Sequence, residues 1–342
     1  MDQIKAYYKI WRELPQPRKI KFIMLMAFAC YSFSLFLLVI YAFGRTGKRT
    51  STIVPTVLFT DGAPYNLEVI RYLAQRRDVI ISMVVLNNNS LSVERLRSNV
   101  ENVKTMLTAL NAEGYAKTVP VYLPQTSSSA NFAPALDQMV SKQSMKFVVV
   151  GPCTEAAYFL REYPARRSNV ANIFVAGGAF NSAGNANYLL ATNTRAERNF
   201  FLDPSAADYV VTASHGRPVT LFPIDATFPW TEEAYTSIVS KPSSPSTSAG
   251  AVATGLQWYY RDVDGTRSTT VGLMAVAYAS DAQVQQTAVY TSIPVRVKKD
   301  QTDAVNGESY RPSSGNSVRV ILRVAADTFF SHLLRVNELA LV

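Results

Sequence analysis

The chain has 342 residues, which is enough for one large α/β domain or two ordinary domains. Charged residues make up only 17% of the chain, against about 25% in an average globular protein, and hydrophobic residues make up 48%. This composition excludes a disordered chain. It indicates a membrane segment or large buried surfaces. The net charge of +9 permits contact with anionic lipid, but the basic residues are dispersed and no nucleic-acid-binding motif is present, so we expect no nucleic-acid partner. Two cysteines and two histidines are too few for a disulfide framework and leave little scope for a metal site built from these residues.

A long apolar run near the N-terminus is the first feature along the chain. Residues 22–43 carry no charged side chain, and about 20 apolar residues suffice for a helix to cross a bilayer. A cleaved signal peptide is the alternative, but its apolar core is usually shorter. We therefore expect a transmembrane helix at 22–43, preceded by a basic amphipathic segment at 1–21 and followed by a linker at 44–51.

From residue 52 onward, short apolar runs alternate with stretches of helical spacing. The runs are typical of buried strands, which we expect at 53–60, 79–86, 119–123, 147–150, 173–175, 219–223, 287–298 and 317–324. Helices are expected at 67–75, 93–110, 134–141, 154–162, 206–213, 274–278 and from about residue 326. This alternation predicts an α/β domain over 52–342 with a mostly parallel central sheet and helices on both faces. The last two strands are expected to pair in an antiparallel hairpin, and the Ser/Pro-rich residues 240–254 are expected to form a low-complexity loop.

Open sheets of this kind bind ligands at the carboxyl ends of their strands. The segments expected there, in chain order, are Thr60-Asp61-Gly62, Asn87-Asn88-Asn89-Ser90, Gly151-Pro152-Cys153-Thr154 and Gly177-Gly178. They are followed by Gly184-Asn185, Glu197-Arg198-Asn199, Asp203-Pro204-Ser205-Ala206-Ala207 and the strand VTLFPIDAT at 219–227. This ordered set resembles the inosine–uridine-preferring nucleoside hydrolase family over roughly residues 52–342. The resemblance implies the α/β fold of that family, here preceded by one transmembrane helix.

The resemblance also implies a chemistry. Members of the family hydrolyse the N-glycosidic bond of ribonucleosides and hold one Ca²⁺ in an oxygen cage. The carboxylates of the cage come mainly from an Asp-Thr-Asp-x-Gly-x-Asp-Asp segment after the first strand and from a late His-Asp pair, and a threonine carbonyl after a Gly-Pro turn completes it. Ca²⁺ takes about six to eight hard oxygen ligands, and a bound metal acidifies the attacking water.

Some residues of the chain match this pattern and others depart from it. Asp61 matches one carboxylate and Thr154 the threonine, while Glu197 and Asn199 match the residues that grip the ribose and Asn185 matches a nearby asparagine. The departures are Phe59 for the first aspartate, Tyr65 and Asn66 for the final pair, and Val271-Gly272 for the His-Asp pair. With these carboxylates gone, Ca²⁺ affinity is expected to collapse, so we expect no metal and no cofactor. Phe59 and Tyr65 are also expected to fill part of the pocket.

Two of the matching residues have a purely structural interpretation as well. Asp61 could cap the helix that follows it, as aspartate often does. Glu197 could pair with Arg195 or Arg198 at the surface. The sequence leaves both interpretations open.

These observations lead us to expect a non-catalytic accessory subunit of a membrane complex, in which a pseudoenzyme of the nucleoside N-ribohydrolase family serves as a scaffold. The expected host is an ATP synthase or respiratory complex of the mitochondrial inner membrane, by analogy with protist complexes. The expected partners are other subunits and the lipid bilayer, including anionic lipid such as cardiolipin. The alternative is a membrane-anchored nucleoside-binding protein or an N-ribohydrolase with an altered metal site.

Overall fold

The structure is a computed structural model that describes Pro15 and residues 53–87, 92–115, 119–124, 132–212, 215–240, 244, 246–263, 265, 267–299 and 302–338. The expected basic segment (apart from Pro15), transmembrane helix and linker lie outside these residues, so the division of the chain before residue 52 stays a prediction. Within the described residues, no helix is both long enough and apolar enough to cross a membrane. The chain from Ile53 to Val342 forms one compact unit.

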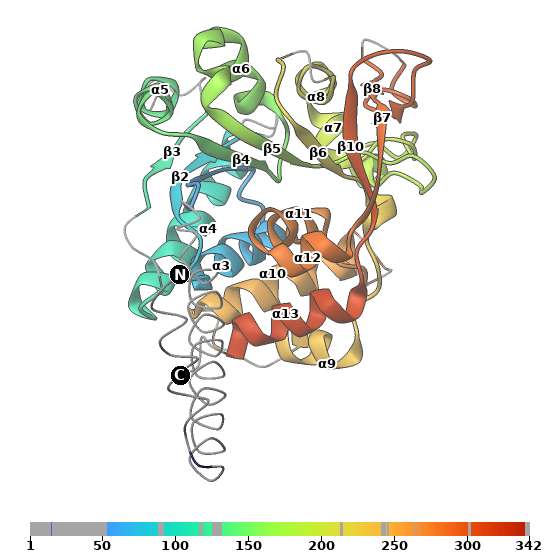
Figure 1. Ribbon diagram of the computed structural model, residues 1–342. Helices are drawn as coiled ribbons and strands as arrows, with labels where there is room; N and C mark the ends of the chain where they lie inside the picture. Colours follow the sequence, from blue (N-terminus) through green and yellow to red (C-terminus); the bar gives the residue numbers. More distant parts are fainter. Residues whose placement is uncertain are drawn as a thin grey trace. The chain divides into compact units, whose positions relative to one another are not determined.

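An eight-stranded sheet with the order β3-β2-β1-β4-β5-β6-β10-β7 forms the centre of this unit (Figure 1). Its strands are β3 (Val121–Tyr122), β2 (Ile81–Leu86), β1 (Thr56–Thr60), β4 (Met145–Val149), β5 (Val170–Ala176), β6 (Val219–Phe222), β10 (Ser317–Arg323) and β7 (Val289–Pro294). Neighbouring strands are parallel except β10 and β7, which are antiparallel. The mostly parallel α/β sheet that the sequence predicted is confirmed. Strands β8 (Arg296–Val297) and β9 (Ser309–Tyr310) form a separate two-stranded ribbon.

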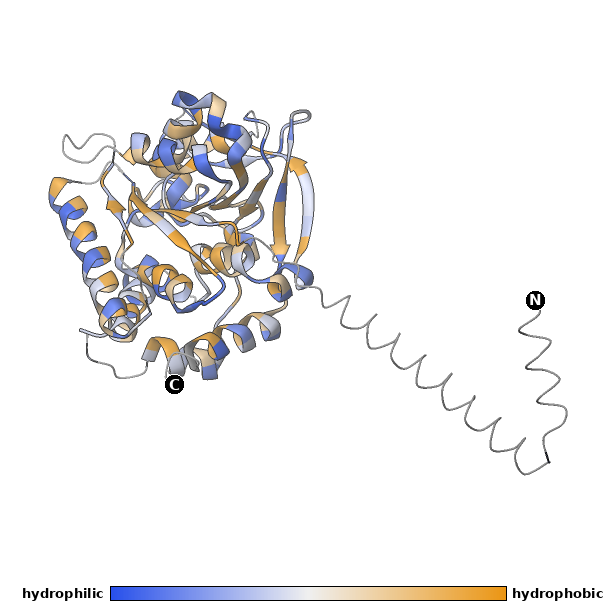
Figure 2. Ribbon diagram, turned by 60° about the vertical axis from the view of Figure 1, so that its left-hand side comes forward, coloured by the Kyte–Doolittle hydropathy of each residue, from blue (hydrophilic) through white to orange (hydrophobic). Residues whose placement is uncertain are grey.

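Helices cover both faces of the sheet (Figure 1). One face carries α3 (Leu67–Gln75), α4 (Val93–Ala112), α10 (Ser248–Asp262), α11 (Val271–Ser280), α12 (Ala282–Thr287) and α13 (Ala326–Glu338). The other carries α5 (Phe132–Lys142), α6 (Thr154–Glu162) and α8 (Pro204–Val211). In Figure 2 the strands are largely hydrophobic, whereas the helices alternate between hydrophobic and hydrophilic residues, as expected for elements with one buried side. Each face therefore has its own hydrophobic core.

The two cores divide the side chains of each strand between them. Leu58 belongs to the core on the α3 side, whereas its neighbours Val57 and Phe59 belong to the core on the α5 side. Successive side chains of a strand point to opposite faces, so each residue is committed to one core by its position alone. All three side chains are fully buried, which explains why the strand has no polar alternation.

Helix α10 occupies part of the segment that was expected to be a loop. Ser248 to Thr254 form the first half of α10, and Thr247 caps it by accepting a hydrogen bond from the N–H of Gly250 at 3.1 Å. The segment was taken for a loop because its small residues show no apolar pattern. A small residue just beyond that segment allows close packing of the helix: a Cβ on Gly255 would lie 2.1 Å from the carbonyl oxygen of Pro64.

The short 3₁₀ turn η1 (Pro64–Asn66) links the end of β1 to α3. Gly62 lies before it with a φ of +67°, a left-handed conformation that glycine adopts readily. The chain therefore turns sharply at the carboxyl end of β1 and places η1 beside α10. The packing of α10 on η1 thereby fixes the position of the residues that follow β1.

Candidate functional site

A pocket of about 480 Å³ lies at the carboxyl ends of the parallel strands. It is lined by Asn66 after β1, Val150 after β4, Asn185 after β5 and Asp225 after β6. The N-terminal ends of α11 and of the short helix α7 (Arg198–Leu202) complete it. Its volume lies within the range of about 300 to 1,000 Å³ that small-molecule sites occupy.

The structure brings most of the residues singled out from the sequence to this pocket. Those that line it are Tyr65, Asn66, Asn185, Glu197, Asn199, Val271 and Gly272. Phe59, Asp61 and Thr154 are not among the lining residues. The segment Asn88-Asn89-Ser90 lies outside the described residues.

Asp61 lies directly behind the pocket and is fully buried. Its Oδ1 accepts hydrogen bonds from the backbone N–H of Ala63 at 3.0 Å and from Nδ2 of Asn66 at 2.9 Å. Its Oδ2 accepts from Nη1 of Arg198 at 2.6 Å, which makes a buried ion pair. Asp61 therefore does not cap helix α3; it closes the turn after β1 and holds Arg198.

Three further groups converge on Asp61. Nδ2 of Asn66 also donates to the carbonyl oxygen of Val150 at 3.1 Å. A Cβ on Gly272 would lie 3.1 Å from Oδ1 of Asn66 and 3.4 Å from Cβ of Val150. One position in the site is thus surrounded by Asp61, Asn66, Val150 and Gly272. Among these four residues only Asp61 carries a charge, and Arg198 pairs with it.

The backbone carbonyl oxygen at this position, which accepts from Asn66, belongs to Val150 and not to Thr154. Thr154 begins α6, and its hydroxyl donates to Oδ2 of Asp203 at 2.7 Å. No pattern in the sequence pointed to Val150, because an apolar residue contributes only its backbone oxygen. Its position at the carboxyl end of β4 is what brings that oxygen into the site.

Glu197 is the buried carboxyl group that lines the pocket at the start of α7. Its Oε2 accepts hydrogen bonds from the N–H of Asn199 at 2.9 Å and of Phe200 at 3.3 Å, so it caps the helix. Burial raises the pKa of Glu197 to about 7, although those two hydrogen bonds act in the opposite direction. In the described structure Arg195 lies against Glu308 and Arg198 against Asp61, so neither ion pair expected for Glu197 forms.

Two asparagines tie the surrounding loops to α7. Oδ1 of Asn185 accepts from the backbone N–H of Arg198 at 2.8 Å. Nδ2 of Asn199 donates to the carbonyl oxygen of Ala176 at 3.0 Å, and its Oδ1 accepts from Nη1 of Arg198 at 3.3 Å. The end of β5, the loop after it and α7 are therefore held together on one side of the pocket.

Tyr65 supplies an aromatic wall. Its ring lies 4.7 Å from the ring of Tyr259 and stacks on Trp258 at 6.3 Å, with 13° between the planes. Phe59 packs instead against Phe132 and Phe147 in the core on the α5 side. The expectation that Phe59 fills the pocket is therefore wrong, because its place in β1 turns it to the opposite face of the sheet.

The sequence analysis missed two charged residues of the site. Asp225 accepts hydrogen bonds from the backbone N–H groups of Phe180, Asn181 and Ser182 at 2.7 to 2.9 Å, which fixes the loop after β5. Arg198 was considered only as a partner of Glu197, whereas its guanidinium group faces Asp61 and lies 5.6 Å from the ring of Tyr65. An arginine between two matching residues was the available signal.

The residues present do not fit the Ca²⁺ ion that the resemblance implied. Asp61 already accepts from three protein donors, Asn66 directs its amide nitrogen to Asp61, and Gly272 has no side chain. Over the part of the chain that the structure describes, no group of three histidine, cysteine or acidic residues could hold a metal ion. Ca²⁺ needs several hard oxygens with more than one charge, and this place offers one carboxylate that is already ion-paired.

The comparisons with known proteins agree with this fold. The model of the family "Inosine-uridine preferring nucleoside hydrolase" matches residues 78–331, and the chain belongs to that family. It is 36% identical over 108 residues to the pyrimidine-specific ribonucleoside hydrolase RihA of Shewanella woodyi, which covers 32% of this chain and 31% of that protein. It is 30% identical over 138 residues to uridine nucleosidase 1 of Arabidopsis thaliana, which covers 40% of this chain and 38% of that protein. The matches thus span about a third of the length of these relatives.

Solved structures extend the similarity in fold to nearly the whole unit. A purine-preferring ribonucleoside hydrolase from Gardnerella vaginalis superposes with a TM-score of 0.66 at 17% identity, covering 83% of this chain and 99% of that chain. A plant nucleoside hydrolase superposes with a TM-score of 0.63 at 17% identity, covering 84% of this chain and 98% of that chain. At this identity the likeness shows the shared fold alone.

These findings correct the function that we expected from the sequence. A non-catalytic subunit of an ATP synthase or respiratory complex is contradicted, because the matching family and the relatives are nucleoside hydrolases. The expected pseudoenzyme is contradicted on the same ground. The single-pass location in the mitochondrial inner membrane is contradicted as well, because the relatives are nucleoside hydrolases. The expectation rested too heavily on the missing carboxylates and on an apolar segment outside the described residues.

Proposed function

We propose that the protein is a nucleoside hydrolase that binds a ribonucleoside in this pocket and cleaves its N-glycosidic bond. The observation that carries the proposal is the convergence of Asn66, Asn185, Glu197 and Asn199 on one pocket beside the ring of Tyr65. Amide and carboxyl groups suit the hydroxyl groups of a ribose, and an aromatic ring suits the flat face of a nucleobase. The activities named for the relatives support the same substrate class.

Glu197 is the group best placed to move a proton in this reaction. Hydrolysis breaks the bond between C1′ of the ribose and the base nitrogen, adds the water oxygen to C1′ and transfers a proton to the leaving base. The other carboxylate that lines the pocket, Asp225, is committed to three backbone N–H groups. Because burial raises the pKa of Glu197 to about 7, a substantial fraction is ionised at neutral pH and can accept the proton of the attacking water.

Isolation from water is the second contribution of the chain. Glu197 is 2% exposed and Arg198 5% exposed, so charges that develop at C1′ meet fixed protein dipoles instead of solvent. The hydrogen bonds that Arg198 donates to Oδ1 of Asn185 and Oδ1 of Asn199 hold α7 in place, which keeps Glu197 in position. The pocket is thus preorganised by contacts that do not involve the substrate.

The test is a panel of ribonucleosides incubated with the full chain, with release of the free base followed by chromatography and binding followed by calorimetry. Glu197→Gln keeps the shape of the side chain and an oxygen that can cap α7, so it should leave binding within a few-fold and lower turnover by about 100-fold or more. Glu101→Gln, on the exposed side of α4, is the matched control and should change neither. Failure of every ribonucleoside to bind or react would reject the proposed function.

A further inference from the structure

We infer that the guanidinium group of Arg198 serves at this site in place of a divalent cation, so that the pocket takes up its ligand without Ca²⁺. Nη1 of Arg198 donates to Oδ2 of Asp61 at 2.6 Å. Asp61 is the one residue of the leading motif that keeps a carboxylate where the family resemblance implied a metal ligand. The chain itself, through Arg198, therefore supplies the positive charge next to that carboxylate.

Burial makes this ion pair difficult to exchange for a metal. The side chains of Arg198 and Asp61 are 6% and 0% exposed. A carboxylate so deeply buried needs a partner, and removing either charge leaves the other uncompensated. A Ca²⁺ ion would have to displace the guanidinium group, and the neighbouring residues Asn66, Val150 and Gly272 would offer it no second carboxylate.

Arg198 also retains a donor that the described protein does not use. Its Nε–H is buried and has no hydrogen-bond partner among the described residues, and Arg198 lines the pocket. A buried donor without a partner costs free energy, which a ligand oxygen would recover. The geometry thus assigns Nε–H to a hydroxyl oxygen of the ligand, and this step rests on the proposed binding of a ribonucleoside.

The first experiment needs no variant. The full chain is purified with a chelator, and thermal unfolding and calorimetry are recorded with CaCl₂ and with EDTA. We expect no saturable calcium binding and no change in melting temperature. Saturable binding that raises the melting temperature by about 4 °C at 100 times the Kd, and that EDTA reverses, would overturn the inference.

A second variant tests the reverse prediction, namely that calcium binding can be created at this position. Arg198→Met combined with Asn66→Asp and Gly272→Asp removes the guanidinium group and adds two carboxylates around Asp61. We expect this variant to gain a calcium-dependent rise in melting temperature, because the oxygens then carry three negative charges. A folded variant that shows no calcium response would contradict the placement of Arg198 at a cation position.

Arg198→Lys separates the charge from the Nε donor. Lysine keeps the positive charge but has no second donor along its stem. We expect the lysine variant to remain insensitive to calcium and to bind the ribonucleoside at least about 10-fold more weakly, with Arg195→Lys, an exposed neighbour, as control. Unchanged affinity in Arg198→Lys would reject the role of Nε. If the wild-type chain bound no ribonucleoside, the proposed function would fail while the calcium measurement would still decide the first part.

Discussion

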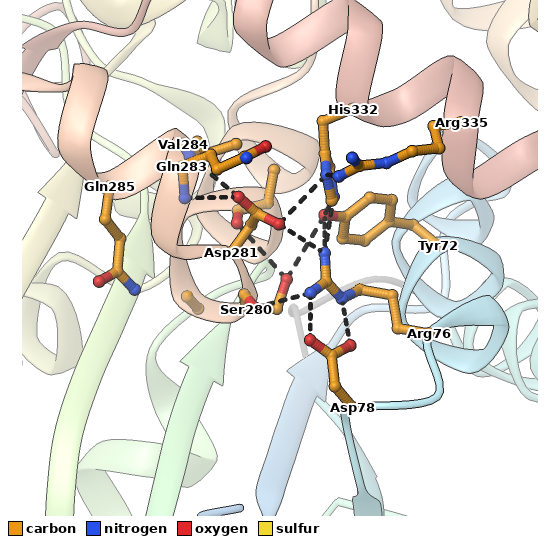
Figure 3. A network of polar contacts seen from close by, with 12 residues as sticks. Tyr72, Arg76, Asp78, Ser280, Asp281, Gln283, Val284, Gln285, His332 and Arg335 are labelled. Carbon is orange, nitrogen blue, oxygen red and sulfur yellow. Dashed lines mark hydrogen bonds and ion pairs between the residues drawn. The ribbon is translucent and has the colours of Figure 1, made fainter. Parts of the chain in front are cut away.

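Nδ1 of His332 lies 3.1 Å from Oδ2 of Asp281, and this contact joins helix α13 to the start of α12 (Figure 3). The other ring nitrogen, Nε2, lies 2.6 Å from Nη1 of Arg76 and 2.7 Å from the hydroxyl of Tyr72. Arg76 can only donate, so Nε2 accepts its hydrogen bond, whereas Nδ1 faces both the carboxylate of Asp281 and, at 3.1 Å, Nη2 of Arg335. An arginine therefore contacts each ring nitrogen: Arg76 at the end of α3, and Arg335 on the same helix as His332.

This network predicts a loss of stability in mild acid. Burial lowers the pKa of His332 below its usual 6.5, and Arg76 and Arg335 act in the same direction, whereas Asp281 opposes them. The unfolded chain therefore binds the proton more readily, so this contribution to stability is present above about pH 6.5 and is lost as the pH falls. Denaturant unfolding at pH 7.5, 6.5 and 5.5 should show the decline, and His332→Gln should remove part of it. An identical pH dependence in the variant would show that His332 is not responsible.

Glu68 predicts a pH dependence of the opposite sign. It is 4% exposed, its Oε1 contacts the hydroxyl of Thr270, and its Oε2 has no partner among the described residues. Burial raises the pKa of this carboxyl from 4.5 to about 8. The folded state holds the proton more tightly, so stability is greatest below about pH 4.5 and declines by about 5 kcal/mol as the pH rises through 8.

Glu68→Gln removes that titration while keeping the shape of the side chain. The variant should exceed the wild type at pH 8.5 in the free energy of unfolding, and this advantage should shrink toward pH 5. Glu101→Gln, which changes a surface carboxyl, serves as the control. A variant that is equally destabilised at both pH values would mean that Glu68 acts by packing alone.

The pair of Asp61 and Arg198 predicts strong coupling in a double-mutant cycle. Asp61→Asn and Arg198→Met should each destabilise the fold by about 3 to 5 kcal/mol, because each leaves one buried charge unpaired. The double variant buries no charge and should be more stable than either single variant. Urea unfolding of the four proteins measures the coupling free energy. Additive effects would indicate that the two side chains do not interact.

Gly255 predicts a steric effect on the site. Its Cβ would lie 2.1 Å from the carbonyl oxygen of Pro64, so Gly255→Ala must push α10 away from η1 at a cost of about 1 to 3 kcal/mol. Tyr65 and Asn66 belong to η1, so ribonucleoside affinity should fall as well. Gly265→Ala is the matched control, since a Cβ there meets no atom within 4 Å and stability should stay within about 0.5 kcal/mol. Equal behaviour of the two variants would contradict the close packing of α10 on η1.

Local periodicity was enough to place several elements from the sequence. The expected helices at 67–75 and 154–162 coincide with α3 and α6, because each begins near a turn residue and carries an apolar face over two turns or more. The expected antiparallel pairing of the last two strands is that of β7 and β10. Helix α10 was missed because its packing depends on small residues, which carry no hydrophobic signal.

The sequence by itself determined the α/β class, the family and the segments that meet at the carboxyl ends of the strands, since these depend on patterns read over a few neighbouring residues. Only the tertiary structure decided what Asp61 and Arg198 do, because 137 residues separate them in the chain and 2.6 Å separate their atoms in the fold. The same holds for Val150, whose backbone oxygen enters the site only through the register of β4 beside β1. Distant residues meet at the edge of a parallel sheet through its crossover connections, and no local pattern encodes which side chains then face each other.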